Sequence, residues 1–173
     1  MTAMSIADQT VVLRGVTWET YERLLADHED SSGPRLFYDC GTLAIMSPSP
    51  THEKLKEAAA EFFKLAAAEM DVDFVSLGST TFRRADLRKG FEPDACFYIE
   101  TNADRMREKD KINLSVDPPP DLVIEVVVTN PALNKLSLYA AVGVPEVWFF
   151  DDKRFEILRL ESDSYRSVAE SAY

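Results

Sequence analysis

The apolar positions of residues 51–70 recur at helical spacing, and the segment is rich in alanine, so the pattern predicts a long helix there. The apolar stripe consists of Leu55, Ala59, Phe62 and Ala66. Ser49 precedes the helix as the candidate N-cap, and Pro50 stands where proline fits the first helical position. We expect the stripe to face the protein core.

Two shorter segments show the same helical spacing. The first covers residues 17–28, with Thr17 as the candidate N-cap, and the second covers 132–142 and ends at Gly143. Clusters of small and turn-forming residues at 31–34 and 129–131 predict breaks in regular structure.

Alternating or continuous apolar runs predict the strands. A hairpin is expected over 35–46, with its turn at residues 39–41, and the sequences PEVWFF and FEILRL indicate a second, closing hairpin. Single strands are expected near 72–77, 80–84, 93–99 and 121–128. Residues 100–118 are polar and show no clear period. This order of elements predicts an α/β (α+β) domain with one central sheet, and no linker divides the chain.

The acidic charge balance restricts the partners. The chain of 173 residues has 19 basic and 30 acidic residues, a net charge of −11 and a pI near 4.6, which argues against a general polyanion binder and against docking on an anionic membrane. The sequence shows neither a secretory signal nor an apolar run long enough to span a membrane, so we expect a cytoplasmic protein. Its two cysteines are far apart, which disfavours a disulfide scaffold or a structural zinc site.

Glu125 is the clearest anomaly in the apolar pattern. It interrupts the run 122–128, whose two faces are both apolar, as is typical of a central strand covered on both sides. A buried carboxylate needs a metal ion, a cationic partner or a raised pKa. The alternative is a glutamate near the sheet edge that reaches water, and the pattern alone does not separate the two.

Asp94 follows Pro93 at the start of another predicted strand whose remaining members are apolar or aromatic. Taken alone, it is typical of a strand-entry or turn aspartate. If its strand lies beside that of Glu125, however, the two carboxylates would form a hard-oxygen site suited to Mg²⁺ or Mn²⁺.

Lys135 can return to Glu125 by chain geometry. The strand advances about 10 Å from Glu125 to Val128, and the following helix recovers about 6 Å by Lys135. Lys135 also shares a helix face with Tyr139, four residues later. The alternative is a solvated helix lysine.

His52 and Glu53 lie at the start of the long helix, where a histidine could bind an anion or orient a metal ligand. The alternative is a polar residue in a first helical turn. The sequence contains no nucleophile elbow, glycine-rich dinucleotide motif, P-loop or zinc-protease motif, so the carboxylates and the lysine remain as the candidate chemistry.

Three segments together resemble the Uma-two family of restriction-endonuclease-like proteins. They are YDCGTLAIMSPSPTHE, GFEPDACFYI and DPPPDLVIEVVVTNPALNKLSLYAAVGVPEVWFF. The resemblance spans a core of about residues 17–160. It implies a branch of the PD-(D/E)xK nuclease superfamily, with a restriction-endonuclease-like domain over 1–173, a mixed sheet flanked by helices, and metal-dependent phosphodiester hydrolysis.

The resemblance assigns roles by position. Asp94 matches the PD aspartate and Glu125 the (D/E) glutamate, while Val127 stands where the usual lysine would be. In this family the lysine is placed on the following helix, and Lys135 resembles it in position. His52 matches the histidine after the SPS-type loop.

The resemblance also implies a mechanism. Asp94 and Glu125, with the carbonyl of Val126, would hold Mg²⁺ or Mn²⁺, which would activate a water molecule, and Lys135 would orient that water or stabilise the developing charge. Supporting roles are expected for His52 or Glu53 in the outer metal shell and for two further residues, Glu92 and Tyr139.

Basic residues shortly before Asp94 are candidates for a phosphate-facing rim, although a solvated surface is the alternative; they are Arg83, Arg84, Arg88 and Lys89. DNA is the expected partner. A homodimer is also expected from the two-fold symmetry of duplex DNA, with the closing hairpin covering the core or supplying the dimer surface.

Two other functions stay open. The first is a non-catalytic interaction or regulatory module that keeps the nuclease fold, which suits the acidic charge. The second is a metal-dependent hydrolase of small phosphoesters.

Overall fold

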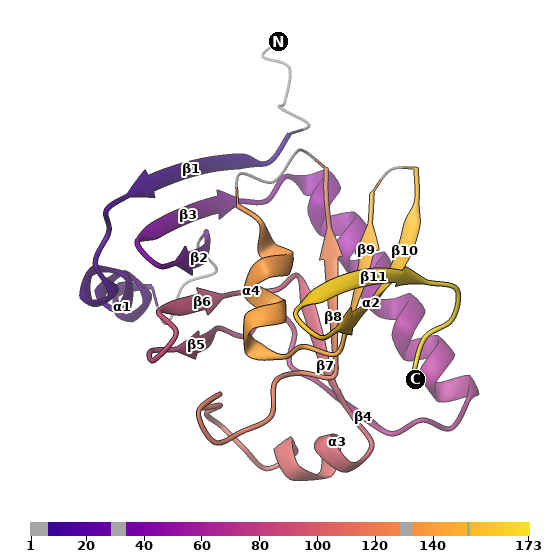
Figure 1. Cartoon of the computed structure of the whole chain (residues 1–173). Helices are drawn as coiled ribbons and strands as arrows, with labels where there is room; N and C mark the ends of the chain where they lie inside the picture. Colours follow the sequence, from indigo (N-terminus) through magenta and orange to yellow (C-terminus); the bar gives the residue numbers. More distant parts are fainter. Residues whose placement is uncertain (1–6, 29–33, 129–132, 152) are drawn as a thin grey trace.

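The computed structural model describes residues 7–28, 34–128, 133–151 and 153–173, and their strands form two sheets (Figure 1). The predicted breaks at 31–34 and 129–131 lie outside the described residues except for residue 34.

The first sheet has five antiparallel strands in the order β1–β3–β2–β6–β5. These are β1 (Gln9–Arg14), β2 (Arg35–Asp39), β3 (Thr42–Ser47), β5 (Phe82–Arg84) and β6 (Lys89–Phe91). Helix α1 (Trp18–Asp27) begins after Thr17, whose side chain accepts the N–H of Thr20 as predicted. Tyr21 of α1 is fully buried and stacks on Tyr38 of β2, so α1 covers one face of this sheet.

The second sheet has six strands in the order β11–β10–β9–β8–β7–β4. These are β4 (Phe74–Ser76), β7 (Ala95–Ile99), β8 (Leu122–Val126), β9 (Glu146–Phe150), β10 (Phe155–Glu161) and β11 (Ser164–Val168). The β8–β9 pair is parallel and the other pairs are antiparallel, so the sheet is mixed. The helix between β8 and β9 provides the crossover that a parallel pair requires.

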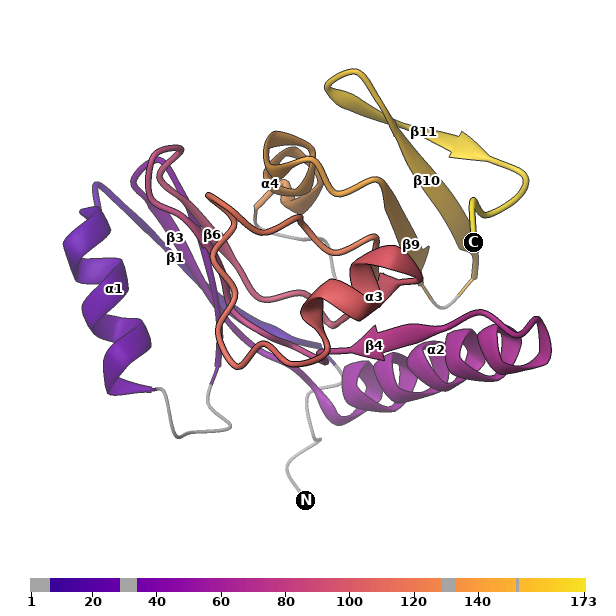
Figure 2. The ribbon, with the colours of Figure 1, turned by 90° about the horizontal axis from the view of Figure 1, so that it is seen from below.

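Helices cover both faces of the second sheet (Figure 2). Helix α2 (Pro50–Glu69) packs Phe63 against Phe97 of β7 on one face. On the other face, helix α4 (Lys135–Val142) lies between the two sheets and ends at Gly143, whose positive φ of 82° closes the helix. The short helix α3 (Thr101–Met106) follows β7. None of the described helices has the length and apolar character needed to cross a membrane.

The predicted α/β class is confirmed, and both hairpins and the three predicted helices are present. The architecture differs from the prediction in having two sheets rather than one central sheet. Four further elements were not predicted, namely β1, β6, α3 and β11. Their sequences are short or polar, so their regular structure depends on pairing and packing with distant segments rather than on local periodicity.

The predicted apolar stripe of the long helix is correct at Ala59, which is buried, and wrong at Phe62. Phe63 is buried, whereas Phe62 is 53% exposed. The alanine-rich helix has apolar residues around most of its circumference, so spacing alone does not fix which face packs. The cluster containing Phe97 and Trp148 instead receives Ala59, Phe63 and Ala67.

Candidate active site

Asp94 and Glu125 occupy opposite positions at the same end of two neighbouring strands. Ala95 of β7 pairs with Ile124 of β8, and continuing this antiparallel register by one position places Asp94 opposite Glu125. The juxtaposition on which the predicted cation site depended is therefore present. Both residues are buried, Asp94 at 1% exposure and Glu125 at 2%.

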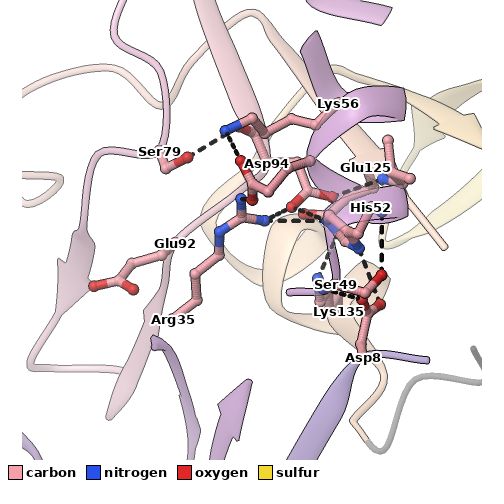
Figure 3. Close-up of polar contacts among 12 residues, drawn as sticks. Asp8, Arg35, Ser49, His52, Lys56, Ser79, Glu92, Asp94, Glu125 and Lys135 are labelled. Carbon is pink, nitrogen blue, oxygen red and sulfur yellow. Dashed lines mark hydrogen bonds and ion pairs between the residues drawn. The ribbon is translucent and has the colours of Figure 1, made fainter. Parts of the chain in front are cut away.

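The Asp94 carboxylate is bound on both oxygens (Figure 3). Oδ2 accepts the backbone N–H of Val126 at 2.7 Å. Oδ1 lies 2.8 Å from Nε2 of His52 and forms an ion pair with Nη1 of Arg35. These contacts hold the carboxylate in one orientation at the strand end.

Glu125 lies in a central strand whose residues are all buried, as the apolar run predicted, so the alternative of a solvated edge glutamate is wrong. Lys135 donates from Nζ to Oε2 of Glu125 at 2.6 Å, and the hydroxyl of Tyr139 donates to Oε1. The contact that chain geometry allowed for Lys135 is thus made. Nζ also lies 4.2 Å from the ring centroid of Phe37. Burial and the neighbouring Glu125 carboxylate raise the pKa of Tyr139 well above its usual value, so its phenol stays a proton donor.

His52 lies in the first turn of α2, where the Ser49 side chain accepts its backbone N–H. Its ring is 1% exposed and lies between two carboxylates, with Nδ1 2.9 Å from Oδ2 of Asp8 and Nε2 2.8 Å from Oδ1 of Asp94. Burial lowers the pKa of His52, although the negative charge of Asp8 opposes the shift. A neutral imidazole has one N–H and can donate to one of these carboxylates at a time.

Arg35, at the start of β2, is a site residue that the sequence did not indicate. It is buried, and its guanidinium contacts three groups: Asp94, His52 Nε2 at 3.3 Å from Nη1, and Glu53 Oε1 at 2.8 Å from Nη2. Asp8 was missed as well. In the sequence, neither residue belongs to a segment with apolar periodicity that would distinguish a buried charge from a solvated one.

The predicted supporting residues divide into two groups. Tyr139 and Glu53 join the site, and Glu53 also accepts from Lys56 at 2.6 Å. Glu92 instead accepts the backbone N–H of Leu36 and the hydroxyl of Thr81, and its carboxylate points away from Asp94 (Figure 3). Its contacts connect β2 to the segment before β5.

The four basic residues predicted as a rim make local contacts along β5, β6 and their connecting turn. Arg83 and Arg84 pair with Glu22 and Asp86. Lys89 pairs with Asp39, and Arg88 donates to the hydroxyl of Tyr38. The structure therefore places these cations on the first sheet and not in contact with the two site carboxylates.

The donor chemistry of the site suits a divalent cation. Asp94 and Glu125 supply carboxylate oxygens, which Mg²⁺ and Mn²⁺ prefer. Val126 uses its N–H toward Asp94, and in a strand the carbonyl of the same residue points to the same side. Continued register places Pro93 opposite Val126, and proline has no N–H to donate to that carbonyl. Within the described residues no group of three or more His, Cys, Asp or Glu side chains is placed to hold a metal ion, so a cation here needs water or substrate oxygens as well, which is usual for Mg²⁺.

The charge of the site is nearly balanced without a metal ion. Four carboxylates and three cations lie around His52. Arg35 pairs with Asp94 and Glu53, Lys56 pairs with Glu53, Lys135 pairs with Glu125, and Asp8 contacts the His52 ring. Such a network in a low-dielectric setting fixes the positions of its members and raises the cost of leaving any one of them unpaired.

The family model of Uma2 (Uma-two), described as "Putative restriction endonuclease", matches residues 18–171. The chain belongs to the Uma2 family. The match covers both sheets except for β1, and it includes every element that contributes Asp94, Glu125, Lys135, His52 and Arg35. Uma2 membership agrees with the resemblance drawn from the sequence and is consistent with the PD-(D/E)xK superfamily. Comparison with curated proteins returned no match.

Proposed function

We propose that this Uma2 protein is a divalent-metal-dependent endonuclease that hydrolyses phosphodiester bonds of DNA. The observation that carries the proposal is the pair of buried carboxylates, Asp94 and Glu125, held opposite each other on adjacent strands with Lys135 bound to one of them. The family description supports a nuclease-like function in general.

Asp94, Glu125 and the carbonyl of Val126 would hold Mg²⁺ or Mn²⁺. When bound, such an ion supplies Lewis acidity to a phosphate and lowers the pKa of a coordinated water. Lys135 places a positive charge beside Glu125, where it would orient the attacking water or stabilise the charge that develops on the phosphate. Tyr139 donates to Glu125 and fixes its orientation. Arg35 and the Val126 N–H fix the orientation of Asp94, and His52 lies beside the same carboxylate.

Cleavage of plasmid DNA tests this proposal. The purified chain is incubated with supercoiled plasmid and Mg²⁺ or Mn²⁺, and nicked and linear products are measured for the wild type and the double variant Asp94→Ala/Glu125→Ala. We expect metal-dependent cleavage that the double variant lacks. Equal background cleavage by both proteins contradicts the proposal.

A matched control separates the site from general effects of losing a carboxylate. Glu92→Gln alters a partly buried glutamate that contacts Leu36 and Thr81 rather than the site, so it should retain cleavage. RNA, nucleotide and dinucleotide substrates in the same assay distinguish a DNA enzyme from a ribonuclease or a hydrolase of small phosphoesters.

A second candidate is a non-catalytic interaction module, and one specific observation favours it. Both oxygens of Asp94 and of Glu125 already have partners within the chain, so the network is complete without a metal ion. Calorimetric titration with Mn²⁺ discriminates the two functions. Absence of Mn²⁺ uptake favours the module, and uptake that Glu125→Gln abolishes favours the nuclease.

Homodimer formation and a cytoplasmic location remain predictions alongside the proposed function. Light scattering of the purified chain with and without duplex DNA tests the first, since two-fold symmetry would match that of the duplex.

A further inference from the structure

We propose that Arg35 is an internal counter-cation that competes with the divalent metal ion for Asp94, and that Glu53 retains the guanidinium when Asp94 is engaged by the metal. The inference rests on the proposed metal-dependent function and adds a control on metal binding within the same site.

The position of Arg35 supports direct competition. Its side chain is 7% exposed, and Nη1 pairs with Oδ1 of Asp94, whose own side chain is 0% exposed. Oδ2 of Asp94 is already occupied by the N–H of Val126. Arg35 therefore neutralises the carboxylate that the metal ion requires, and it does so on the oxygen that is not part of the backbone contact.

Charge balance requires one cation to withdraw. Asp94 and Glu125 carry two negative charges, and Arg35 and Lys135 already offset both. A divalent ion added here changes the net charge of the four carboxylates and three cations of the site from −1 to +1. It also stands beside two cations that are already paired with its ligands, an arrangement that low dielectric makes costly.

The guanidinium of Arg35 has a second anionic partner in Glu53, which explains why Arg35 rather than Lys135 leaves its carboxylate when the metal ion binds. Its Nη2 already donates to Oε1 of Glu53 at 2.8 Å, and the Glu53 side chain is 41% exposed, so this end of the guanidinium lies toward solvent. Lys135, in contrast, is held by the Glu125 carboxylate and the face of the Phe37 ring. His52 is fixed through Asp8 and need not follow Arg35.

Mn²⁺ binding to the full chain, measured by calorimetry and by electron paramagnetic resonance of free Mn²⁺, tests the inference without relying on cleavage. We expect Arg35→Gln to bind Mn²⁺ on the order of tenfold more tightly than the wild type, because it removes the competing charge. Arg35→Lys is the matched control, since it retains the positive charge and should bind Mn²⁺ much more weakly than Arg35→Gln.

Glu53→Gln gives an independent test at a partly exposed position that is compatible with folding even where Arg35→Gln is not. It should weaken Mn²⁺ binding severalfold, because Arg35 then keeps Asp94 as its remaining anionic partner. In an Arg35→Gln background the same substitution should have no effect, since there is no guanidinium to retain. A persistent effect would mean that Glu53 acts on the metal ion itself and would overturn this part of the inference.

The outcomes distinguish this inference from the proposed function. Mn²⁺ binding with equal affinity by the wild type, Arg35→Gln and Glu53→Gln overturns the competition and leaves the metal-dependent function standing. Absence of Mn²⁺ binding by every variant overturns both. Circular dichroism of each variant confirms that the compared proteins are folded.

Discussion

The carboxylate of Asp94 accepts the backbone N–H of Val126 at 2.7 Å, one residue beyond Glu125. This single hydrogen bond ties the start of β7 to the end of β8, at the point where Pro93 cannot donate to the ladder. The two carboxylates of the site therefore derive their relative position from sheet register, and a rigid sheet is a more exact support for a site than a loop.

Lys135→Ala should lower both stability and cleavage. It removes the cation that donates to buried Glu125, and breaking a buried ion pair from one side costs about 3 kcal/mol. Urea denaturation followed by tryptophan fluorescence measures the loss. Lys64→Ala, which breaks a more exposed pair with Glu61, should change the free energy of unfolding by less than about 1 kcal/mol. Equal effects of the two substitutions would contradict the structural role of Lys135.

Tyr139→Phe should destabilise the chain by about 2 kcal/mol, because it removes a hydrogen bond to a charged, buried acceptor. Tyr98→Phe is the matched control, since its hydroxyl donates to the neutral carbonyl of Pro118, and its loss should cost about 1 kcal/mol. The two free energies of unfolding are compared from urea denaturation. A smaller cost for Tyr139→Phe than for Tyr98→Phe would show that Glu125 does not depend on the phenol.

Glu125 could be recognised from the sequence because it violates a local pattern. Glu125 interrupts an otherwise apolar strand, and a carboxylate there has few physical explanations. Strand and helix rise allowed Lys135 to return to Glu125, with a solvated helix lysine as the alternative. The order of the strands in the sheet places Asp94 beside Glu125, and no local pattern encodes that order. The sequence therefore predicted the carboxylate pair only on the condition that the two strands are neighbours.

His52 should titrate below its usual pKa of about 6.5. Burial lowers the pKa of His52, so the folded state binds its proton less readily than the unfolded state. Its contribution to stability is therefore present above pH 6.5 and is lost as pH falls toward the folded pKa. Proton NMR of the two histidines measures the midpoint of His52 directly. Asp8→Asn should lower this midpoint further, because the Asp8 charge raises the pKa; a higher midpoint would contradict the contact with Asp8.

Glu92→Gln should become more stable relative to the wild type as pH rises above about 4.5. Burial raises the pKa of Glu92, with hydrogen bonds from Thr81 and the Leu36 N–H opposing the shift. The stabilising contribution of the protonated form is thus complete below pH 4.5 and is lost as pH rises through the folded pKa. Urea denaturation at several pH values should show a difference that grows by at most about 1.4 kcal/mol per pH unit. A difference that does not change with pH would contradict the raised pKa.

The remaining parts of the site had no local signal. Arg35 opens a strand after a turn-rich segment, where a charged residue is most often solvated, and Asp8 lies 44 residues before its partner His52. Phe62 and Phe63 are adjacent apolar residues, and the packing surface formed by Phe97 and Trp148 decides which is buried. These features depend on long-range packing, which the spacing of residues along the chain does not specify.

A crystal of the full chain soaked with Mn²⁺, measured at a wavelength that gives anomalous scattering from manganese, tests the central claim most directly. The account predicts an anomalous peak bridging the carboxylates of Asp94 and Glu125, within ligand distance of the Val126 carbonyl, and Arg35 displaced from Asp94 toward Glu53. A site without an anomalous peak, with Arg35 still paired to Asp94 and Lys135 to Glu125, would contradict it.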